Sequence, residues 1–418
     1  MPKSKTLKKI FDRVKITPVE LDDEREAASL ISSLGVSMEG VRILSSKSIY
    51  LALKISGIRS WEANIIKQHL LSLGTDAAIE RRALLKDIET TILIFGSLSQ
   101  LKKLCEKLEN QPFNLNRISK EISLCLYNLQ KKDFVFQARN KKFRIKKPLV
   151  CGIINLTADS FSGDGLLEKS NISSVQLKEL ALRKCDAMVK KGAKIIDLGA
   201  ESSRPFSKGI KVKEEIERLL PVLKAIRKEY KKIMISVDTY KYSVAESVAD
   251  AGADIINDIT ALRGDSKMAK LISSYKLGCV LMHMRGTPRT MQIKPVYKDV
   301  VDELIDFFRE RISYCVDKGI DCRRIFIDPG IGFGKRLEDN LAIISGLNKF
   351  KSLGLPIFLG LSRKSFIGKI LNTKVQQRLV GTIAASAIAI AKGANVLRVH
   401  DVGETLQAIK IISRINNS

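Results

Sequence analysis

The chain has 418 residues, of which 45% are hydrophobic, and its 72 lysine and arginine residues against 45 acidic ones give a formal net charge of +27 at pH 7. This length and composition are typical of a globular protein of two domains and exclude a mainly disordered chain. No apolar run approaches the roughly 20 residues that a membrane-spanning helix needs, which excludes a transmembrane protein. The basic N-terminus has no apolar segment after it, so we expect no secretory signal and a cytoplasmic location.

The positive charge raises the hypothesis of nucleic-acid binding. Against it, the basic residues are spread along the whole chain among acidic ones, with modest clusters at 141–147 and 228–232. No basic-aromatic alternation or known binding motif accompanies them, so we expect no nucleic-acid partner. A field that attracts an anionic substrate explains the charge as well. Seven cysteines form no C-x-x-C pair and histidine occurs three times, so the sequence indicates neither a disulfide framework nor a zinc site.

The first part of the chain, residues 1–145, mixes strand and helix patterns. "IYLALKIS" from Ile49 and "TTILIFG" from Thr90 predict strands, whereas "ANIIKQHLLSLG" from Ala63 and "SLSQLKKLCEKLEN" from Ser97 predict helices. This combination indicates a small α+β domain. The segment carries no metal, phosphate or nucleophile motif, so its role stays open.

From about residue 149 onward, one pattern recurs: a short apolar run, polar residues at its end, and an amphipathic stretch of helical length. Continuous apolar runs are typical of parallel strands that are covered on both faces. We therefore predict a (β/α)₈ TIM barrel over residues 146–418, following the smaller N-terminal α+β domain. The eight runs begin at Leu149, Ala193, Ile233, Ala253, Gly278, Arg324, Pro356 and Asn395.

Polar side chains stand at the ends of all eight predicted strands. In such a barrel the loops that leave the carboxyl ends of the strands converge on one face, where active sites are built. Taken singly, each residue could be a helix cap or part of a structural ion pair, Asp197 and Asp258 in particular. As a set they favour an active site, and the set is Asn155, Asp197, Glu201, Ser203, Arg204, Asp238, Thr239, Asn257, Asp258, His283, Arg285, Asp328, Ser362, Arg363, Lys364, Arg398, His400 and Asp401.

The chemistry of this set suits a flat polar ring and an anion. Buried carboxylates and an asparagine accept hydrogen bonds from an amino-substituted nitrogen heterocycle, and a lysine donates to its carbonyl or ring nitrogen. Asn155, Arg398 and His400, on the first and last strands, suit a phosphate group and its metal. No serine stands in a nucleophile elbow and no lysine is typical of a Schiff base, which favours catalysis by positioning and leaving-group stabilisation.

"DPGIGFGK" from Asp328 is not a phosphate-binding loop, because Lys335 is followed by Arg336 where that motif requires serine or threonine. Together with "GIINLTADSFS", "DLGAESSRP", "SVDT", "INDI", "MHMRGTPRTMQ", "GLSRKSFIG" and "RVHD", in their order along the chain, it resembles dihydropteroate synthase. The resemblance runs from about Pro148 to the C-terminus and leaves the first 145 residues uncovered.

The resemblance implies a folate-pathway transferase that is a target of sulfonamides. Such an enzyme condenses 6-hydroxymethyl-7,8-dihydropterin diphosphate with p-aminobenzoate, releases pyrophosphate by a dissociative mechanism, and uses Mg²⁺. It also implies a homodimer. The implied pterin residues are Asp238, Asn257, Met282, Asp328, Gly360 and Lys364. The implied diphosphate residues are Asn155, Ser203, Arg398 and His400, with Asn155 also binding the metal. The implied p-aminobenzoate residues are Ser203, Arg204, Pro205, Phe333 and Ser365. The implied catalytic residues are Asn155, Asp238, Lys364, Arg398 and His400.

Some positions depart from the family pattern. Ala158 replaces the usual proline, Ser203 the usual threonine and Phe206 the usual glycine, and the sequence around Asp164 differs as well. Two alternatives stay open. One is a methyltetrahydrofolate:corrinoid methyltransferase on the same kind of barrel, which would not need the diphosphate residues Arg398 and His400. The other is a non-catalytic binding protein.

Overall fold

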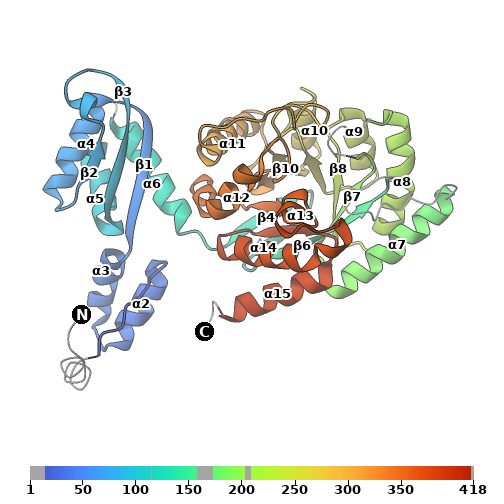
Figure 1. Ribbon diagram of the computed structural model, residues 1–418, viewed down its shortest axis with the longest axis horizontal. Helices are drawn as coiled ribbons and strands as arrows, with labels where there is room; N and C mark the ends of the chain where they lie inside the picture. The colour runs from blue at the N-terminus through green and yellow to red at the C-terminus, as the bar shows by residue number, and fades with distance from the viewer. Residues whose placement is uncertain (1–14, 114, 158–172, 203–208, 416–418) are drawn as a thin grey trace. The chain divides into compact units, whose positions relative to one another are not determined.

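The computed structural model describes residues 15–113, 115–157, 173–202 and 209–415 (Figure 1). The chain divides into two compact units, Met1–Gln130 and Lys131–Ser418. In the described part of the chain, no helix is both long enough and apolar enough to cross a membrane.

The first unit is an α+β structure, as predicted. Its antiparallel sheet has the strand order β1-β3-β2, formed by β1 (Tyr50–Arg59), β2 (Ala77–Ile79) and β3 (Glu89–Ser97). Buried side chains of the sheet, such as Ile92 and Ile94, pack with those of the helices, such as Leu70 and Leu101, in one apolar cluster. The helices are α2 (Glu24–Ser33), α3 (Met38–Ser48), α4 (Ser60–Ser72), α5 (Leu98–Glu109) and α6 (Leu115–Leu129), with a 3₁₀ turn at Arg81–Leu84.

The second unit contains the predicted barrel. All eight strands are parallel and stand in the order β11-β10-β9-β8-β7-β6-β13-β12, and a parallel bridge between Ile327 and Ile357 joins the two ends of the sheet. The predicted fold is confirmed, and each of the eight apolar runs contains one strand. The strands are β6 (Leu149–Asn155), β7 (Ile195–Gly199), β8 (Met234–Asp238), β9 (Ile255–Asp258), β10 (Gly278–Met282), β11 (Ile325–Asp328), β12 (Phe358–Gly360) and β13 (Val396–Val399).

Helices follow the strands and cover the outside of the barrel (Figure 1). The helix after β6, α7, shows how local sequence sets the ends of a helix. At its start the Ser173 hydroxyl accepts from the Gln176 N–H in a capping box, and at its end Gly192 adopts the left-handed conformation. The helices are α7 (Ser174–Lys191), α8 (Val212–Glu229), α9 (Tyr242–Asp250), α10 (Met268–Ser274), α11 (Val300–Asp317), α12 (Leu337–Ser345), α13 (Ser365–Leu371), α14 (Leu379–Ala391) and α15 (Val402–Ile415), with 3₁₀ turns at Cys322–Arg324, Leu347–Leu353 and Val375–Gln377.

A β-hairpin closes the end of the barrel at which the strands begin. It consists of β4 (Phe134–Ala138) and β5 (Lys141–Ile145), which pair antiparallel. The buried Phe136 ring stacks on Phe326 of β11 with the ring centroids 4.0 Å apart. A Cβ atom on Gly278 would lie 2.5 Å from Phe136 Cζ, so glycine at that position leaves the space for the ring. These contacts join the hairpin to the barrel, although it lies before residue 146, where the barrel domain was predicted to begin.

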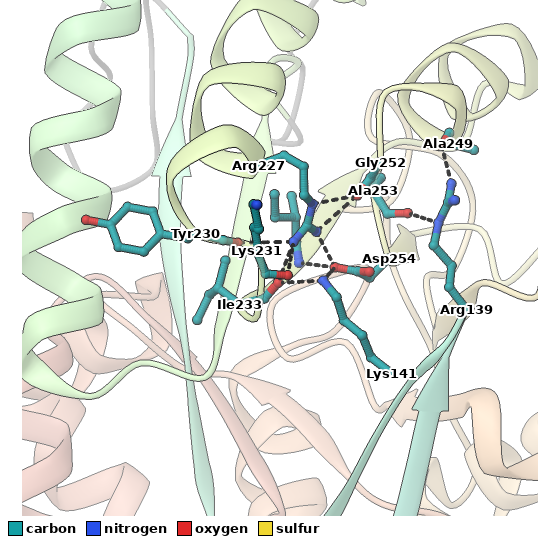
Figure 2. A network of polar contacts seen from close by, with 11 residues as sticks. Arg139, Lys141, Arg227, Tyr230, Lys231, Ile233, Ala249, Gly252, Ala253 and Asp254 are labelled. Carbon is teal, nitrogen blue, oxygen red and sulfur yellow. Dashed lines mark hydrogen bonds and ion pairs between the residues drawn. The ribbon is translucent and has the colours of Figure 1, made fainter.

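Polar contacts hold the same hairpin in place (Figure 2). The Asp254 carboxylate, 1% exposed, accepts from Lys141 Nζ at 2.9 Å, from the Ile235 N–H at 2.9 Å and from the Arg227 guanidinium. Arg139, in the turn of the hairpin, donates to the Ala253 carbonyl at 2.8 Å. One buried carboxylate therefore joins the hairpin, α8 and the start of β9.

Candidate active site

The parallel register brings the polar strand ends into one layer. Asn155 pairs with Gly199, Gly199 with Asp238, and Asp238 with Asn257, across four neighbouring strands. A Cβ atom on Gly199 would lie 3.7 Å from both Asn155 Oδ1 and Asp238 Cβ, so these two side chains flank a position without a side chain. The barrel thereby places residues that are far apart in sequence around one mouth.

Arg398 on β13 is the centre of an ion-pair network in this layer. Its Nε donates to Asp197 Oδ2 at 2.6 Å and its Nη2 to Asp238 Oδ2 at 3.1 Å. Burial alone would lower the pKa of Arg398, but the two carboxylates outweigh it and the net effect is a raised pKa. Burial raises the pKa of Asp238, against the opposing charge of Arg398. Asp197, for which a structural ion pair stayed open, is therefore paired inside the candidate site.

Several buried polar atoms beside Arg398 have no partner among the described residues. Asn257 Nδ2 donates to Asp197 Oδ2 at 3.4 Å, whereas Asn257 Oδ1, Asp197 Oδ1 and Ser236 Oγ make no hydrogen bond. Leaving a buried donor or acceptor unsatisfied costs about 1–3 kcal/mol. A polar ligand or water in the barrel mouth would satisfy these atoms, and this property marks the layer as a binding site.

A lysine and an aspartate face the site from β11 and the loop after β12. Asp328 is buried and its Oδ1 accepts from the Gly330 N–H at 2.7 Å, while burial raises its pKa. Lys364 donates to the Ile331 carbonyl, and its ammonium lies 4.7 Å from the centroid of the Phe333 ring. Burial lowers the pKa of Lys364 to about 8, against the opposing charge of Asp328.

An apolar wall stands beside these polar groups. It is a cluster of buried side chains against which Tyr240 packs, formed by Ile259, Met282, Met284, Met291 and Phe333. A Cβ atom on Gly360 would lie 3.7 Å from Lys364 Nζ and 4.0 Å from Arg398 Cβ, so glycine keeps this part of the site open. Methionines and an aromatic ring next to carboxylates suit a flat heterocycle with polar edges.

Phe333, Lys364 and Ser365 line a cavity of about 250 Å³. Gln292 lies on the same cavity, and its Nε2 donates to the Gly332 carbonyl at 2.9 Å. Phe333 and Ser365, both expected on the p-aminobenzoate side, thus lie together beside Lys364.

Of the residues expected at the diphosphate, Asn155 and Arg398 lie on adjoining strands, and His400 directly follows β13. Asn155 ends β6, next to β13, which carries Arg398. Arg398 points toward Asp197 and Asp238, and His400 Nδ1 lies 2.9 Å from Ser362 Oγ. Arg398 is thus held by carboxylates before any anion binds.

The described residues omit part of the predicted site. Ser203, Arg204 and Pro205 lie outside them, as do the departures from the family pattern at Ala158, Asp164 and Phe206. Within the described ranges, no group of three or more histidine, cysteine or acidic side chains could hold a metal ion. A cation bound in the barrel mouth would therefore be coordinated by oxygen atoms of single side chains, such as that of Asn155.

Sequence reasoning missed the role of Lys335. It is 3% exposed, and its Nζ lies 2.9 Å from His283 Nδ1, 3.0 Å from the Gly330 carbonyl and 3.1 Å from the Phe333 carbonyl. Burial lowers the pKa of Lys335 to about 7, and it lowers the pKa of His283 to about 2 with help from the charge of Lys335. The lysine fixes the turn that carries Phe333. The motif "DPGIGFGK" includes Lys335, but the motif alone does not show that this side chain points into the protein.

Lys241 was also missed. Its Nζ contacts Glu201, lies 2.7 Å from Glu215 Oε2 and 2.8 Å from the Ile210 carbonyl, and the Tyr240 hydroxyl donates to Glu201 at 2.9 Å. This network joins the loops after β7 and β8 to α8 at the rim of the mouth.

Comparison with known proteins agrees with this geometry. The sequence model of the pterin-binding enzyme family matches residues 151–400. The dihydropteroate synthase of Haemophilus influenzae is 39% identical over 274 residues, which are 66% of this chain and 96% of that protein. The Escherichia coli K12 enzyme of the same name is 40% identical over 275 residues, covering 66% of this chain and 94% of the relative.

Solved structures give the same result. Yersinia pestis dihydropteroate synthase in complex with a sulfonamide drug has a TM-score of 0.64 and 37% identity, covering 68% of this chain and 100% of that one. Xanthomonas albilineans dihydropteroate synthase with 4-aminobenzoic acid has a TM-score of 0.60 and 34% identity, covering 68% and 98%. The chain therefore belongs to the dihydropteroate synthase family of pterin-binding enzymes.

Proposed function

We propose that this chain condenses 6-hydroxymethyl-7,8-dihydropterin diphosphate with p-aminobenzoate, giving 7,8-dihydropteroate and pyrophosphate. The observation that carries the proposal is the polar floor of the barrel mouth, where Arg398 joins Asp197 and Asp238 while Asp197 Oδ1 and Asn257 Oδ1 have no hydrogen-bond partner among the described residues. Relatives that are 39–40% identical over nearly their full length carry the name of this enzyme.

The pterin would lie between this polar floor and the methionine-rich wall. Asp238, Asn257 and Asp328 offer oxygen acceptors to the amino group and ring N–H donors of the pterin, and Lys364 offers a donor to its carbonyl or ring nitrogen. The wall that includes Met282 would cover one face of the ring, and Gly360 would leave room beneath it.

The diphosphate would lie toward Asn155, Arg398 and His400, with Ser203 contributing from its loop. Mg²⁺ usually keeps several waters and takes one or two protein oxygens together with substrate phosphates. This fits a mouth in which the described residues offer single oxygen donors, and Asn155 would hold the ion. When bound, Mg²⁺ would neutralise charge on the departing diphosphate.

The reaction then needs positioning rather than a nucleophilic side chain. The bond between the pterin methylene carbon and the diphosphate oxygen breaks, and both electrons leave with pyrophosphate. The carboxylates of Asp238 and Asp328 stabilise the pterin cation that remains. The amino group of p-aminobenzoate, held by Ser203, Arg204, Pro205, Phe333 and Ser365, attacks the methylene carbon and then loses a proton.

A homodimer in the cytoplasm belongs to the same proposal. The Yersinia pestis structure is a complex with a sulfonamide drug and the Xanthomonas albilineans structure one with 4-aminobenzoic acid, and such ligands would occupy the Phe333 and Ser365 side of this site. The relatives favour the synthase over the corrinoid methyltransferase and the non-catalytic alternative, because both relatives quoted are synthases.

The test is turnover by the purified full-length protein. With the pterin diphosphate, Mg²⁺ and p-aminobenzoate, we expect both products to form. Omission of Mg²⁺ or of p-aminobenzoate should prevent formation of dihydropteroate. A protein that is folded by circular dichroism and still forms neither product contradicts the proposal.

A further inference from the structure

A second cavity lies at the opposite end of the barrel from the candidate active site. It has a volume of about 640 Å³ and is formed by the β4–β5 hairpin and the starts of β6, β7 and β8. Of the ten described residues that line it, six carry a positive charge and none carries a negative one. The six are Lys141, Lys142, Arg144, Lys194, Lys231 and Lys232.

This wall differs from the rest of the surface. The chain as a whole has 45 acidic residues for 72 basic ones, whereas the described residues of this wall include six basic ones and no acidic one. Here only two of the six cations have an ionic partner among the described residues: Lys141 pairs with Asp254 at 2.9 Å, and Arg144 with Asp133 at 2.5 Å. Lys142, Lys194, Lys231 and Lys232 make no ion pair in the described part of the chain. Four uncompensated ammonium groups around one hollow attract an anion.

The scaffold holds these cations close together. The Asp254 carboxylate accepts from Arg227 as well as from Lys141, so its single charge is shared between these two cations (Figure 2). Arg227 Nη1 also donates to the carbonyls of Lys231, at 3.2 Å, and Ile233, at 2.9 Å, which fixes the turn before β8. The backbone that carries Lys231 and Lys232 is thereby anchored to the same network as the hairpin.

The remaining wall is apolar and aromatic. Met234 is buried, Leu149 and Phe143 are half-buried, and the Phe143 ring packs at 5.5 Å from that of Phe136. Asn140 adds an amide at the turn of the hairpin. Ligand cavities usually have volumes of about 300–1,000 Å³, so this cavity is large enough for a small molecule.

We propose that this basic cavity binds an oligophosphate, either free or as part of a nucleotide. A single phosphate would engage two or three of the cations, whereas a chain of phosphates reaches lysines on both the hairpin and the turn before β8. The proposal is independent of the synthase reaction, because the two sites lie at opposite ends of the barrel.

Calorimetric titration of the full-length protein at low salt tests it. The probes are inorganic tripolyphosphate, ATP, adenosine and a short single-stranded oligonucleotide. The test variant is the double substitution Lys194→Ala with Lys232→Ala. The matched control is Lys224→Ala with Lys228→Ala, two exposed lysines of α8 that do not line the cavity and whose loss changes the net charge equally.

We expect tripolyphosphate to bind at one site and the test variant to lose about tenfold in affinity, since it lacks two of the cations that would contact the phosphates. The control should bind as the wild type does, and both variants should keep synthase activity. Tighter binding of ATP than of tripolyphosphate, with no binding of adenosine, assigns a nucleotide; equal binding assigns a free oligophosphate.

Three results would overturn the proposal. One is the absence of binding. Another is an equal loss in both variants, which would reflect only the diffuse charge of the protein. The third is binding of a single-stranded oligonucleotide far more tightly than tripolyphosphate, with the affinity falling alike in both variants.

Discussion

Arg398 donates its Nε to Asp197 Oδ2 at 2.6 Å, and Asp197 is fully buried. The contact joins β13 to β7 across β6 in the barrel wall. Breaking such a pair by removing one partner leaves a buried charge without compensation, whereas removing both does not. The interaction therefore has both a structural and a functional consequence.

Arg398→Ala is expected to lower the free energy of unfolding by about 3 kcal/mol and to abolish product formation. The double variant Arg398→Ala with Asp197→Asn should recover part of the lost stability, because one of the two carboxylates that Arg398 compensates, Asp197 and Asp238, is then gone. Urea denaturation of the two single variants and the double variant measures the coupling. Strictly additive losses would show that the pair is not energetically linked.

Lys364→Ala and Asp328→Ala should each weaken binding of the pterin, because each removes a hydrogen bond to a charged group. Such bonds are worth about 1.5–3 kcal/mol, which corresponds to about 10- to 100-fold in affinity. Calorimetry with the pterin diphosphate measures the effect. Lys349→Ala, at an exposed position after α12, is the control and should bind normally. Unchanged affinity in both site variants would refute their role.

The stability of the protein should carry a pH signature of Lys335. Its pKa in the folded state is lowered to about 7 by burial, from an ordinary 10.5. Between these values the unfolded chain binds the proton that the folded chain releases, so this group makes stability rise with pH. The free energy of unfolding of the wild type minus that of Lys335→Met should therefore increase from about pH 7 to pH 10.5. If this value instead decreases between pH 7 and pH 10.5, the lowered pKa of Lys335 is contradicted.

The hairpin makes a further prediction about domain boundaries. We propose that residues 131–418 fold and act without the first unit, whereas residues 146–418 do not, because the shorter fragment lacks the Phe136 ring that covers the end of the barrel. Loss of a buried phenylalanine alone costs about 3–5 kcal/mol. Thermal denaturation and synthase activity of both fragments decide the matter. Equal stability of the two fragments would show that the hairpin is dispensable.

Gly278 gives an independent check of the same contact. Gly278→Ala should destabilise the wild type, because its Cβ would lie 2.5 Å from Phe136 Cζ and 3.2 Å from Ile255 Cγ1. In the Phe136→Leu background the loss should be smaller, because the aromatic ring is absent. Denaturant titration of the four proteins gives the coupling energy, and a coupling near zero would contradict the packing.

The sequence predicted the barrel well for a physical reason. Runs such as the one from Ile233 are apolar without alternation because parallel strands are covered on both faces, and that signal is local. The polar strand ends were predictable in the same way, since Asn155, Asp238 and Asp328 directly end their strands.

What the sequence could not supply depends on contacts between distant residues. Arg398 and Asp197 are 201 residues apart, and nothing local tells whether the guanidinium faces a carboxylate or a phosphate. The burial of Phe136 depends on its contact with Phe326 and on the absence of a side chain at Gly278, and both residues are far from it in sequence. In the sequence Lys335 looks like an exposed loop lysine, and only the structure shows that it is buried against the carbonyls of its own turn.

A synthase site at the barrel mouth is best tested by the ratio of the two products. Given the pterin diphosphate, Mg²⁺ and p-aminobenzoate, the protein should form one dihydropteroate for each pyrophosphate released, and Arg398→Ala should form neither. Pyrophosphate release without dihydropteroate, or equal turnover by Arg398→Ala, would contradict a synthase site at the mouth of the barrel.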